Sequence, residues 1–165
     1  MPTGKNKVPM AQLRDVLAQD GFGNVQTYIQ SGNALVNTDL PAKEVEHRIH
    51  QLIKKHIGAD LVVVARTVTQ LQKVLDENPF AKGHDISRLF FVSFAESPLL
   101  QKIKDLLAQD FSPEKLAIAK NTAYMYIPGT YGRGKLSNNF LERKLGVPAT
   151  TRNFNTLSKL IEMSK

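Results

Sequence analysis

The apolar positions in the first half of the chain recur with helical spacing in three segments and with strand-like composition in three others. Apolar residues three or four positions apart predict a helix, whereas short runs of β-branched and aromatic residues predict strands. The expected helices cover 9–20, 41–57 and 67–77, and the expected strands cover 24–30, 34–37 and 61–64. Ser31-Gly32-Asn33 predicts a tight turn that makes 24–37 a β-hairpin. The run at 61–64 is almost wholly apolar, which is typical of an interior strand.

The second half repeats this order of elements. Its expected strands cover 89–94, 115–120, 123–127 and 148–152, and its expected helices cover 99–107, 135–145 and a last segment at 154–161. The order β-α-β-β-α-β is that of a ferredoxin-like plait, and the first half has the same order without its first strand. The predicted fold class is therefore α+β, with two tandem ferredoxin-like (βαββαβ) plaits, the first lacking its opening strand. The predicted domains are 1–80 and 81–165, related by internal duplication.

The absent opening strand has a structural consequence. In a plait this strand lies in the centre of the sheet, so its loss leaves backbone groups of two neighbouring strands without partners. Two explanations stay open: the chain start is truncated, or another segment, such as one from a dimer partner, fills the place.

The composition limits the compartment, the kinds of metal site and the partners that can be predicted for the chain. The chain has 165 residues, no cysteine and a net charge of +7. The absence of cysteine excludes disulfides and thiolate metal sites and favours a cytoplasmic protein. No apolar run reaches the ~20 residues of a membrane helix, so no membrane partner is predicted. The positive charge favours anionic partners, with a lysine-rich surface without a specific partner as the alternative.

Four sequence blocks carry a family resemblance: Gly4–Met10, Thr27–Asn33, Gly132–Ser137 and Pro148–Thr156. They resemble the signature blocks of the bacterial family called domain of unknown function 1697, over essentially the whole chain. The resemblance implies two ferredoxin-like plaits in one polypeptide and no established activity. Members of that family usually begin with an apolar strand, and many have Ser where this chain has Gly134 and Trp where it has Phe154.

The glycine-rich segment Gly129–Lys135 has the spacing of a phosphate-binding Walker A loop. Leu136 follows where that motif needs a Ser or Thr for magnesium, so a nucleotide triphosphatase is not predicted. Backbone amides of the loop and the start of the following helix favour an anion, and Arg133 and Lys135 add positive charge. The alternative is a surface loop that needs its glycines only for turns.

The polar run Thr150–Thr156 supplies the other part of the first candidate site. In a plait the third and fourth strands end at the same sheet edge, roughly 10 Å apart, on either side of the first strand. We therefore expect the segments that follow them to share one anion, with arginines on phosphate oxygens, Lys135 adding charge and the polar residues orienting the ligand. The alternative is that Thr151 or Asn153 caps the last helix. The predicted ligand-binding residues are Arg133, Lys135, Ser137, Arg152, Asn153 and Thr156.

A second candidate site lies at the turn of the first hairpin. Its residues are Lys5, Asn6, Gln30, Ser31 and Asn33. The alternative is an ordinary hairpin turn.

No reaction is predicted from the titratable residues. His47 and His50 are three positions apart on a helix, but no convergent third ligand accompanies them, so neither a metal nor a cofactor is predicted. No Ser-His-acid or paired-carboxylate arrangement follows from the spacing, which leaves open whether the protein is an enzyme.

Aromatic residues on two expected strands raise a second function, an RNA- or DNA-binding module. Tyr124 and Tyr126 share one strand face, as do Phe90 and Phe94 on the expected neighbour, and a plait can stack bases on such side chains. The Lys/Arg-Gly-Phe-Gly pattern of RNA-recognition plaits is absent. Burial against the other half of the chain is the alternative. A third function, a structural or regulatory interaction protein, is favoured if the polar runs are buried caps.

Overall fold

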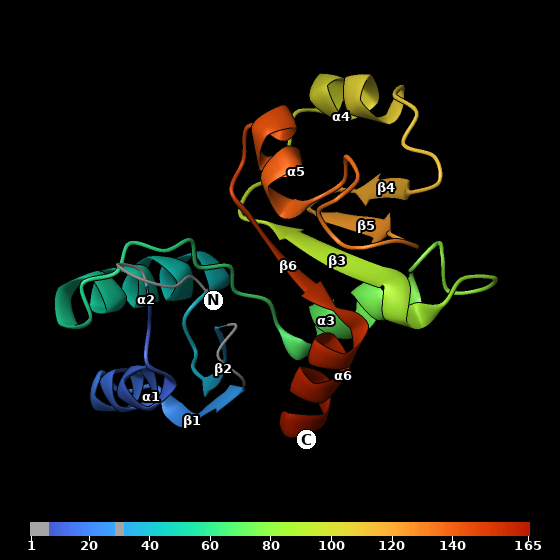
Figure 1. Cartoon of the computed structure of the whole chain (residues 1–165). Coiled ribbons are helices and arrows are strands. Elements are labelled where there is room, and N and C mark those ends of the chain that lie inside the picture. Colours follow the sequence, from blue (N-terminus) through green and yellow to red (C-terminus); the bar gives the residue numbers. More distant parts are fainter. Residues whose placement is uncertain (1–6, 29–31) are drawn as a thin grey trace. The chain divides into compact units, whose positions relative to one another are not determined.

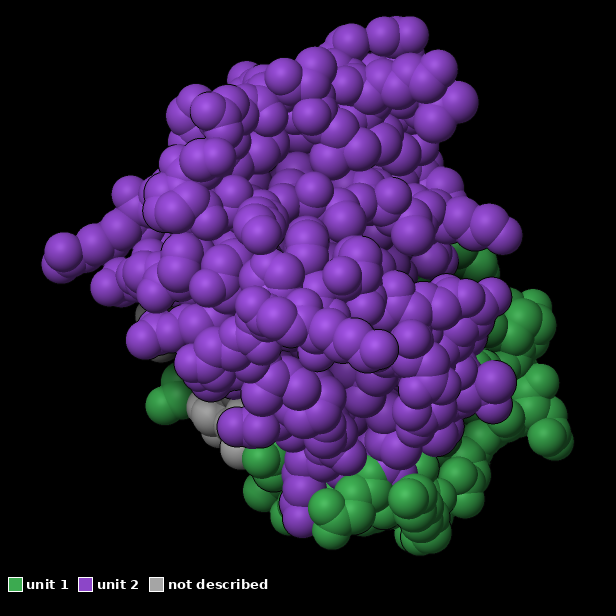
Figure 2. Space-filling model, turned by 90° about the vertical axis from the view of Figure 1, so that its right-hand side faces the viewer, with its two compact units in different colours: residues 1–67, 162–165 green, residues 68–161 purple. Residues whose placement is uncertain are grey.

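The computed structural model describes residues 7–28 and 32–165. These residues form a mixed α+β structure with two antiparallel sheets and six α-helices. The chain divides into two compact units, which Figure 2 shows in different colours. Unit 1 comprises residues 1–67 and 162–165, and unit 2 comprises residues 68–161. The division falls between Thr67 and Val68, whereas the sequence pattern placed it after residue 80. No helix of the described residues is both long and apolar enough to cross a membrane.

Unit 1 contains two helices and a hairpin in the predicted order. Helix α1 spans Met10–Gln19, strands β1 and β2 span Gly23–Tyr28 and Asn33–Asn37, and helix α2 spans Ala42–His56. The strands pair antiparallel, with Thr27 opposite Ala34. The apolar stripes of both helices meet in one core, where Leu13, Leu17, Val45 and Ile53 are buried. The predicted helices and hairpin of this unit are therefore confirmed.

The interior strand predicted at 61–64 is wrong. The sheet of unit 1 contains only β1 and β2 among the described residues, and Val62 is 46% exposed. Alternate residues Ala59, Leu61, Val63 and Ala65 nevertheless pack against the unit 1 core. The segment thus has the period-two burial of a strand without the backbone ladder that defines one. An apolar pattern predicts that a segment is buried, but it does not predict whether a partner strand is present.

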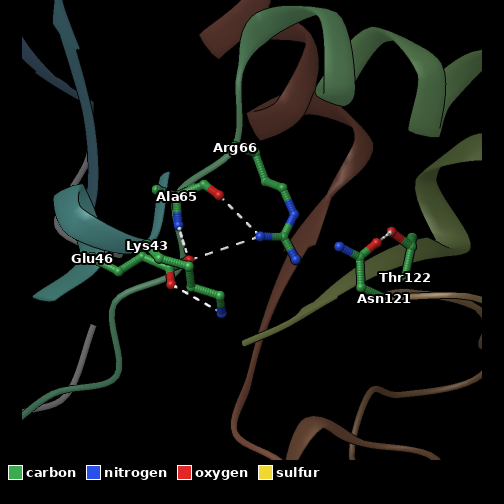
Figure 3. A network of polar contacts seen from close by, with 6 residues as sticks. All are labelled: Lys43, Glu46, Ala65, Arg66, Asn121 and Thr122. Atoms are coloured by element: carbon green, nitrogen blue, oxygen red, sulfur yellow. Dashed lines mark hydrogen bonds and ion pairs between the residues drawn. The ribbon is translucent and has the colours of Figure 1, made fainter. Parts of the chain in front are cut away.

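A carboxylate binds the end of this segment instead of a neighbouring strand. The backbone N–H of Ala65 donates to Oε2 of Glu46 at 2.8 Å (Figure 3). Arg66 Nη1 lies 3.9 Å from the same Oε2, and Lys43 Nζ lies 3.4 Å from Oε1. Glu46 on helix α2 therefore connects the helix to the extended segment through side-chain contacts.

Unit 2 is built around a four-stranded sheet (Figure 1). Its strands are β3 (Leu89–Phe94), β4 (Lys115–Ala119), β5 (Thr122–Tyr126) and β6 (Ala149–Asn153). Its helices are α3 (Val68–Asp76), the short 3₁₀ helix η2 (Ile86–Arg88), α4 (Leu100–Leu107), α5 (Asn138–Leu145) and α6 (Phe154–Met163). The last two residues of α6 belong to unit 1. The sheet order is β4-β5-β3-β6 and every neighbouring pair is antiparallel. The predicted element order of the second half is therefore confirmed, whereas the tandem pair of plaits stays a prediction.

The two faces of this sheet are covered by different helices. On one face, Val92 and Phe94 of β3 pack with Leu106 of α4 and Leu141 of α5. On the other face, Phe91 and Tyr124 pack with residues of α3 and with Leu157 of α6. Because successive residues of a strand point to opposite faces, each residue of β3 belongs to one core or the other. This alternation decides which face each candidate residue can reach.

Candidate functional site

Several polar groups of the loop between β5 and α5 form hydrogen bonds within the loop or with the start of α5. Ser137 caps α5, because its Oγ accepts the backbone N–H of Phe140 at 3.1 Å. The N–H of Asn138 donates to the hydroxyl of Tyr131 at 2.8 Å, and the N–H of Arg133 donates to the carbonyl of Thr130. Two of the amides at the start of α5 are therefore already occupied by side chains of the loop. The prediction that these backbone amides hold a ligand is wrong at those positions.

The anion beside the glycines is a side chain of the protein itself. The N–H of Leu136 donates to Oε1 of Glu114 at 3.0 Å, and Glu114 is only 9% exposed. A Cβ on Gly134 would overlap the same carboxylate, so a larger residue here would require the Glu114 side chain to shift. The N–H of Leu136 is thus bound by a carboxylate of the protein itself, whereas anion binding by this loop stays a prediction.

A cavity of about 480 Å³ lies on the outer side of the same loop. Its wall is formed by the end of α4, the loop and one side of α5. Its lining residues are Gln109, Gly134, Lys135, Ser137, Asn139, Phe140, Arg143 and Lys144. We call this cavity the cationic groove, because Lys135, Arg143 and Lys144 line it and no carboxylate does.

Helical spacing places the two cations of α5 beside one aromatic ring. Arg143 and Lys144 follow Phe140 by three and four positions, which puts them on the same side of the helix. Arg143 Cζ lies 5.6 Å and Lys144 Nζ 5.9 Å from the centroid of the Phe140 ring. The groove therefore combines positive side chains with an apolar ring beneath them. Arg143 and Lys144 are not among the predicted ligand-binding residues, although their spacing from Phe140 is visible in the predicted helix.

The cations of the groove have no short ion pairs within the described part of the chain. No carboxylate oxygen of residues 7–28 or 32–165 lies within the 4.0 Å of an ion pair from Lys135, Arg143 or Lys144. The carboxyl of Asp110 is close enough to Lys135 for the charge of the lysine to affect its pKa. Hydrogen bonds from Ser112 chiefly lower the pKa of the Asp110 carboxyl, and the charge of Lys135 lowers it further.

Arg152 does not join Lys135, so the predicted shared site is corrected on this point. Arg152 pairs with Phe91 across β3 and β6, which places its side chain on the sheet face of α3 and α6. Lys135 leads into α5, which covers the opposite face. The ends of β5 and β6 do lie at one sheet edge, with Tyr126 opposite Leu89 and Asn153 opposite Phe90. The loop is held by Glu114 next to the outer strand β4. At the start of α5, however, Asn138 Nδ2 donates to the carbonyl of Ala149 and Asn138 Oδ1 accepts the hydroxyl of Thr151, so the end of the loop lies against β6.

The remaining polar residues of the first candidate site have structural contacts. Arg152 Nη1 donates to the carbonyl of Thr151 at 2.8 Å, and burial lowers the pKa of the Arg152 guanidinium. Asn153 Oδ1 accepts the N–H of Thr156 at 2.9 Å, and Thr156 is buried. Arg133 is exposed and does not line the cationic groove. The capping interpretation of the polar run therefore holds for Asn153.

Replacing Asn153 by alanine is expected to lower the free energy of unfolding by about 1 kcal/mol, because the N–H of Thr156 loses its cap at the start of α6. Urea unfolding followed by circular dichroism measures this loss. The matched control is Asn155→Ala, an exposed asparagine in the first turn of the same helix. An equal loss in both variants would contradict the capping role.

The second candidate site lies mostly outside the described residues. Lys5, Asn6, Gln30 and Ser31 belong to the parts that the structure does not describe. Asn33 is 6% exposed, and its Nδ2 donates to the carbonyl of Tyr28 at 3.3 Å. For Asn33 the structure therefore shows a contact that closes the hairpin.

The aromatic residues do not form an open platform. Phe94 and Tyr124 are buried, and the hydroxyl of Tyr124 donates to the carbonyl of Val74 in α3 at 3.0 Å. The half-buried Tyr126 lies against His84, with ring centroids 4.6 Å apart, and Phe90 lies 4.8 Å from Tyr131. Helices and loops of unit 2 itself thus pack against these four rings, which offer no open surface for stacking bases.

The histidines of α2 do not gather further metal ligands. His50 Nε2 lies 2.8 Å from Oδ1 of Asp60, while His47 is exposed. Within residues 7–28 and 32–165, no group of three or more His, Asp or Glu side chains has the arrangement of a metal site.

Comparisons with known proteins address the family and the fold. A sequence model of the family described as "Protein of unknown function (DUF1697)" matches residues 2–124. A comparison with curated protein sequences finds no match. Among solved structures, the chain is similar to the conserved bacterial protein SP0830 from Streptococcus pneumoniae, with a TM-score of 0.68 and 23% identity. The alignment covers 98% of this chain and 92% of that chain. A likeness at this identity shows a shared fold and transfers no residue role.

Proposed function

Since the chain belongs to this family of proteins of unknown function, DUF1697, we propose a function from the geometry alone. Unit 2 binds a small polyanion, such as a phosphorylated metabolite, in the cationic groove. The observation that carries this proposal is the meeting of Lys135, Arg143 and Lys144 around one cavity that no carboxylate lines.

The groove offers the chemistry that a phosphorylated ligand needs. A guanidinium donates two parallel hydrogen bonds to phosphate oxygens. A lysine ammonium group attracts phosphate as a point charge and needs no such fixed geometry. The side-chain amides of Gln109 and Asn139 line the same space and can donate to further oxygens. Phe140 is largely buried and supports Arg143 and Lys144 from beneath, so the contacts to the ligand are mainly polar.

The size of the groove favours a small ligand over a macromolecule. A volume of about 480 Å³ falls within the roughly 300–1,000 Å³ of small-molecule sites. The net charge of +7 raises the local concentration of anions around the whole protein. Because Phe94 and Tyr124 are buried, the same charge has no aromatic platform to combine with for nucleic-acid recognition.

Titration of the full chain with phosphate, pyrophosphate and tripolyphosphate tests this proposal. We expect the affinity to rise with ligand charge, and backbone NMR shifts to change most at Lys135, Asn139 and Arg143. Raising NaCl from about 20 mM to about 200 mM should weaken binding, because exposed charges are screened.

The matched control is Lys73→Ala, which removes one exposed cation from α3 on the other face of the sheet and should bind as the wild type does. Shift changes spread over all surface lysines would show unspecific charge attraction and contradict a site. Tighter binding of a single-stranded oligonucleotide than of tripolyphosphate would favour the nucleic-acid alternative.

We also propose that the two units are versions of one ferredoxin-like plait. In unit 2, α4, β4, β5, α5 and β6 follow the central strand β3. In unit 1, α1, β1, β2 and α2 come in the same order, and the alternately buried segment 59–65 follows them. This correspondence supports an internal duplication in which β3 has no counterpart among the described residues of unit 1.

A further inference from the structure

The buried carboxylate of Glu114 lies at the back of the loop that lines the cationic groove. Glu114 directly precedes β4, and its Oε1 accepts the N–H of Leu136 at 3.0 Å. Its carboxylate also contacts the position of Gly134 so closely that a Cβ there would overlap it. Glu114 therefore binds Leu136 on one side of Lys135 and lies against Gly134 on the other.

Gly134, Lys135 and Leu136 lie in different environments. The Leu136 side chain is 0% exposed in the core beneath α4 and α5, whereas Lys135 is exposed and lines the groove together with Gly134. Glu114 holds the Leu136 amide and the core holds the Leu136 side chain, which anchors the backbone from which Lys135 extends. Glu114 thus acts on the groove through Lys135 and does not line the groove itself.

The charge of Glu114 works against an anion in the groove. A buried carboxylate is weakly screened by solvent, so its repulsion of a nearby anion is larger than that of an exposed one. The same side chain therefore has two opposite effects. Its hydrogen bond to Leu136 shapes the anion site, and its negative charge weakens anion binding.

From this arrangement we infer that Glu114 is a positioning residue of the cationic groove that also limits its affinity for polyanions. The inference rests on the proposed anion-binding function. The repulsion from Glu114 lowers the affinity for every anion in the groove and grows with the charge of the ligand, and it speeds release of the ligand.

Two substitutions of Glu114 separate the two effects. Glu114→Gln keeps an oxygen that accepts the N–H of Leu136 and removes the charge, so the Kd for tripolyphosphate should fall about two- to fivefold at low salt. Glu114→Ala removes the acceptor as well, so the Kd should rise about tenfold and hydrogen exchange of the Leu136 amide should accelerate. The control Glu77→Gln makes the same change in net charge after α3, on the other sheet face, and should match the wild type.

The outcomes distinguish this inference from the proposed function. Tighter binding by Glu114→Gln that disappears at high salt, together with weaker binding by Glu114→Ala, supports it. Equal Kd values for the wild type and Glu114→Gln, with normal wild-type binding, overturn the inference alone. Failure of the wild type to bind tripolyphosphate overturns the proposed function and this inference with it. Glu114→Gln retains the hydrogen bond to Leu136 and is expected to fold. If Glu114→Ala fails to fold, the comparison of the wild type with Glu114→Gln still tests the inference.

Discussion

Replacing both Arg143 and Lys144 by alanine is expected to weaken tripolyphosphate binding by about 25-fold or more at low salt. Each exposed cation that contacts a phosphate contributes on the order of 1 kcal/mol, and about 2 kcal/mol corresponds to a factor of roughly 30 in Kd. Both residues lie in the last turn of α5 and are exposed, so their loss should leave the fold intact. Isothermal titration calorimetry of the wild type and the variant measures the effect.

The matched control for this experiment removes two other cations from the same unit. Lys73 and Lys82 are exposed and do not line the cationic groove, so the double alanine variant loses the same charge elsewhere. We expect this control to weaken binding less than about threefold, because only the general field of the protein changes. Equal losses in the two double variants would show that net charge, and not the groove, attracts the ligand.

Replacing Leu136 by alanine is expected to lower the free energy of unfolding of unit 2 by about 3 kcal/mol. The side chain is 0% exposed in the core that α4 and α5 share with the sheet, so its truncation leaves a cavity. Since Leu136 also anchors the loop between Lys135 and Ser137, we expect weaker tripolyphosphate binding in the same variant. Native-state hydrogen exchange of the β3 and β5 amides reports the stability of unit 2 directly.

An exposed leucine of the same unit provides the control for this prediction. Leu100 at the start of α4 is 66% exposed, and its replacement by alanine should change the free energy of unfolding by less than about 0.5 kcal/mol. A loss in Leu136→Ala as small as that in Leu100→Ala would contradict the anchoring role. It would also weaken the argument that the loop has one defined conformation.

Local periodicity was sufficient to predict most of the helices and strands. The stripes of α1 and α2, the hairpin of β1 and β2, and the element order of unit 2 all appear in the structure. The segment 61–64 shows the limit of this approach. Its apolar residues correctly indicated contact with the core, yet a strand also needs a neighbouring backbone, which no local pattern specifies.

The candidate site could be predicted only in part, because local patterns do not specify contacts between residues distant along the chain. The glycine-rich loop and Lys135 were visible as an anion-binding pattern, and Lys135 and Ser137 do line the groove. Arg143 and Lys144 were missed because cations in the last turn of a helix usually have only a structural effect on the helix dipole. Arg152 was assigned to the wrong side because its face depends on pairing with Phe91, and strand register is a long-range property.

The amino-acid sequence by itself determined the α+β class, the positive charge, the helix stripes and the glycine-rich loop before α5. These properties depend on residue types and on spacings of a few residues, where helix and strand geometry are already defined. Only the tertiary structure decided that the loop's anion is Glu114, that Lys135 meets Arg143 and Lys144, and that Arg152 lies on the other face of the sheet. Such contacts join residues distant along the chain, and their geometry follows from packing around a shared core, which spacing along the sequence does not encode.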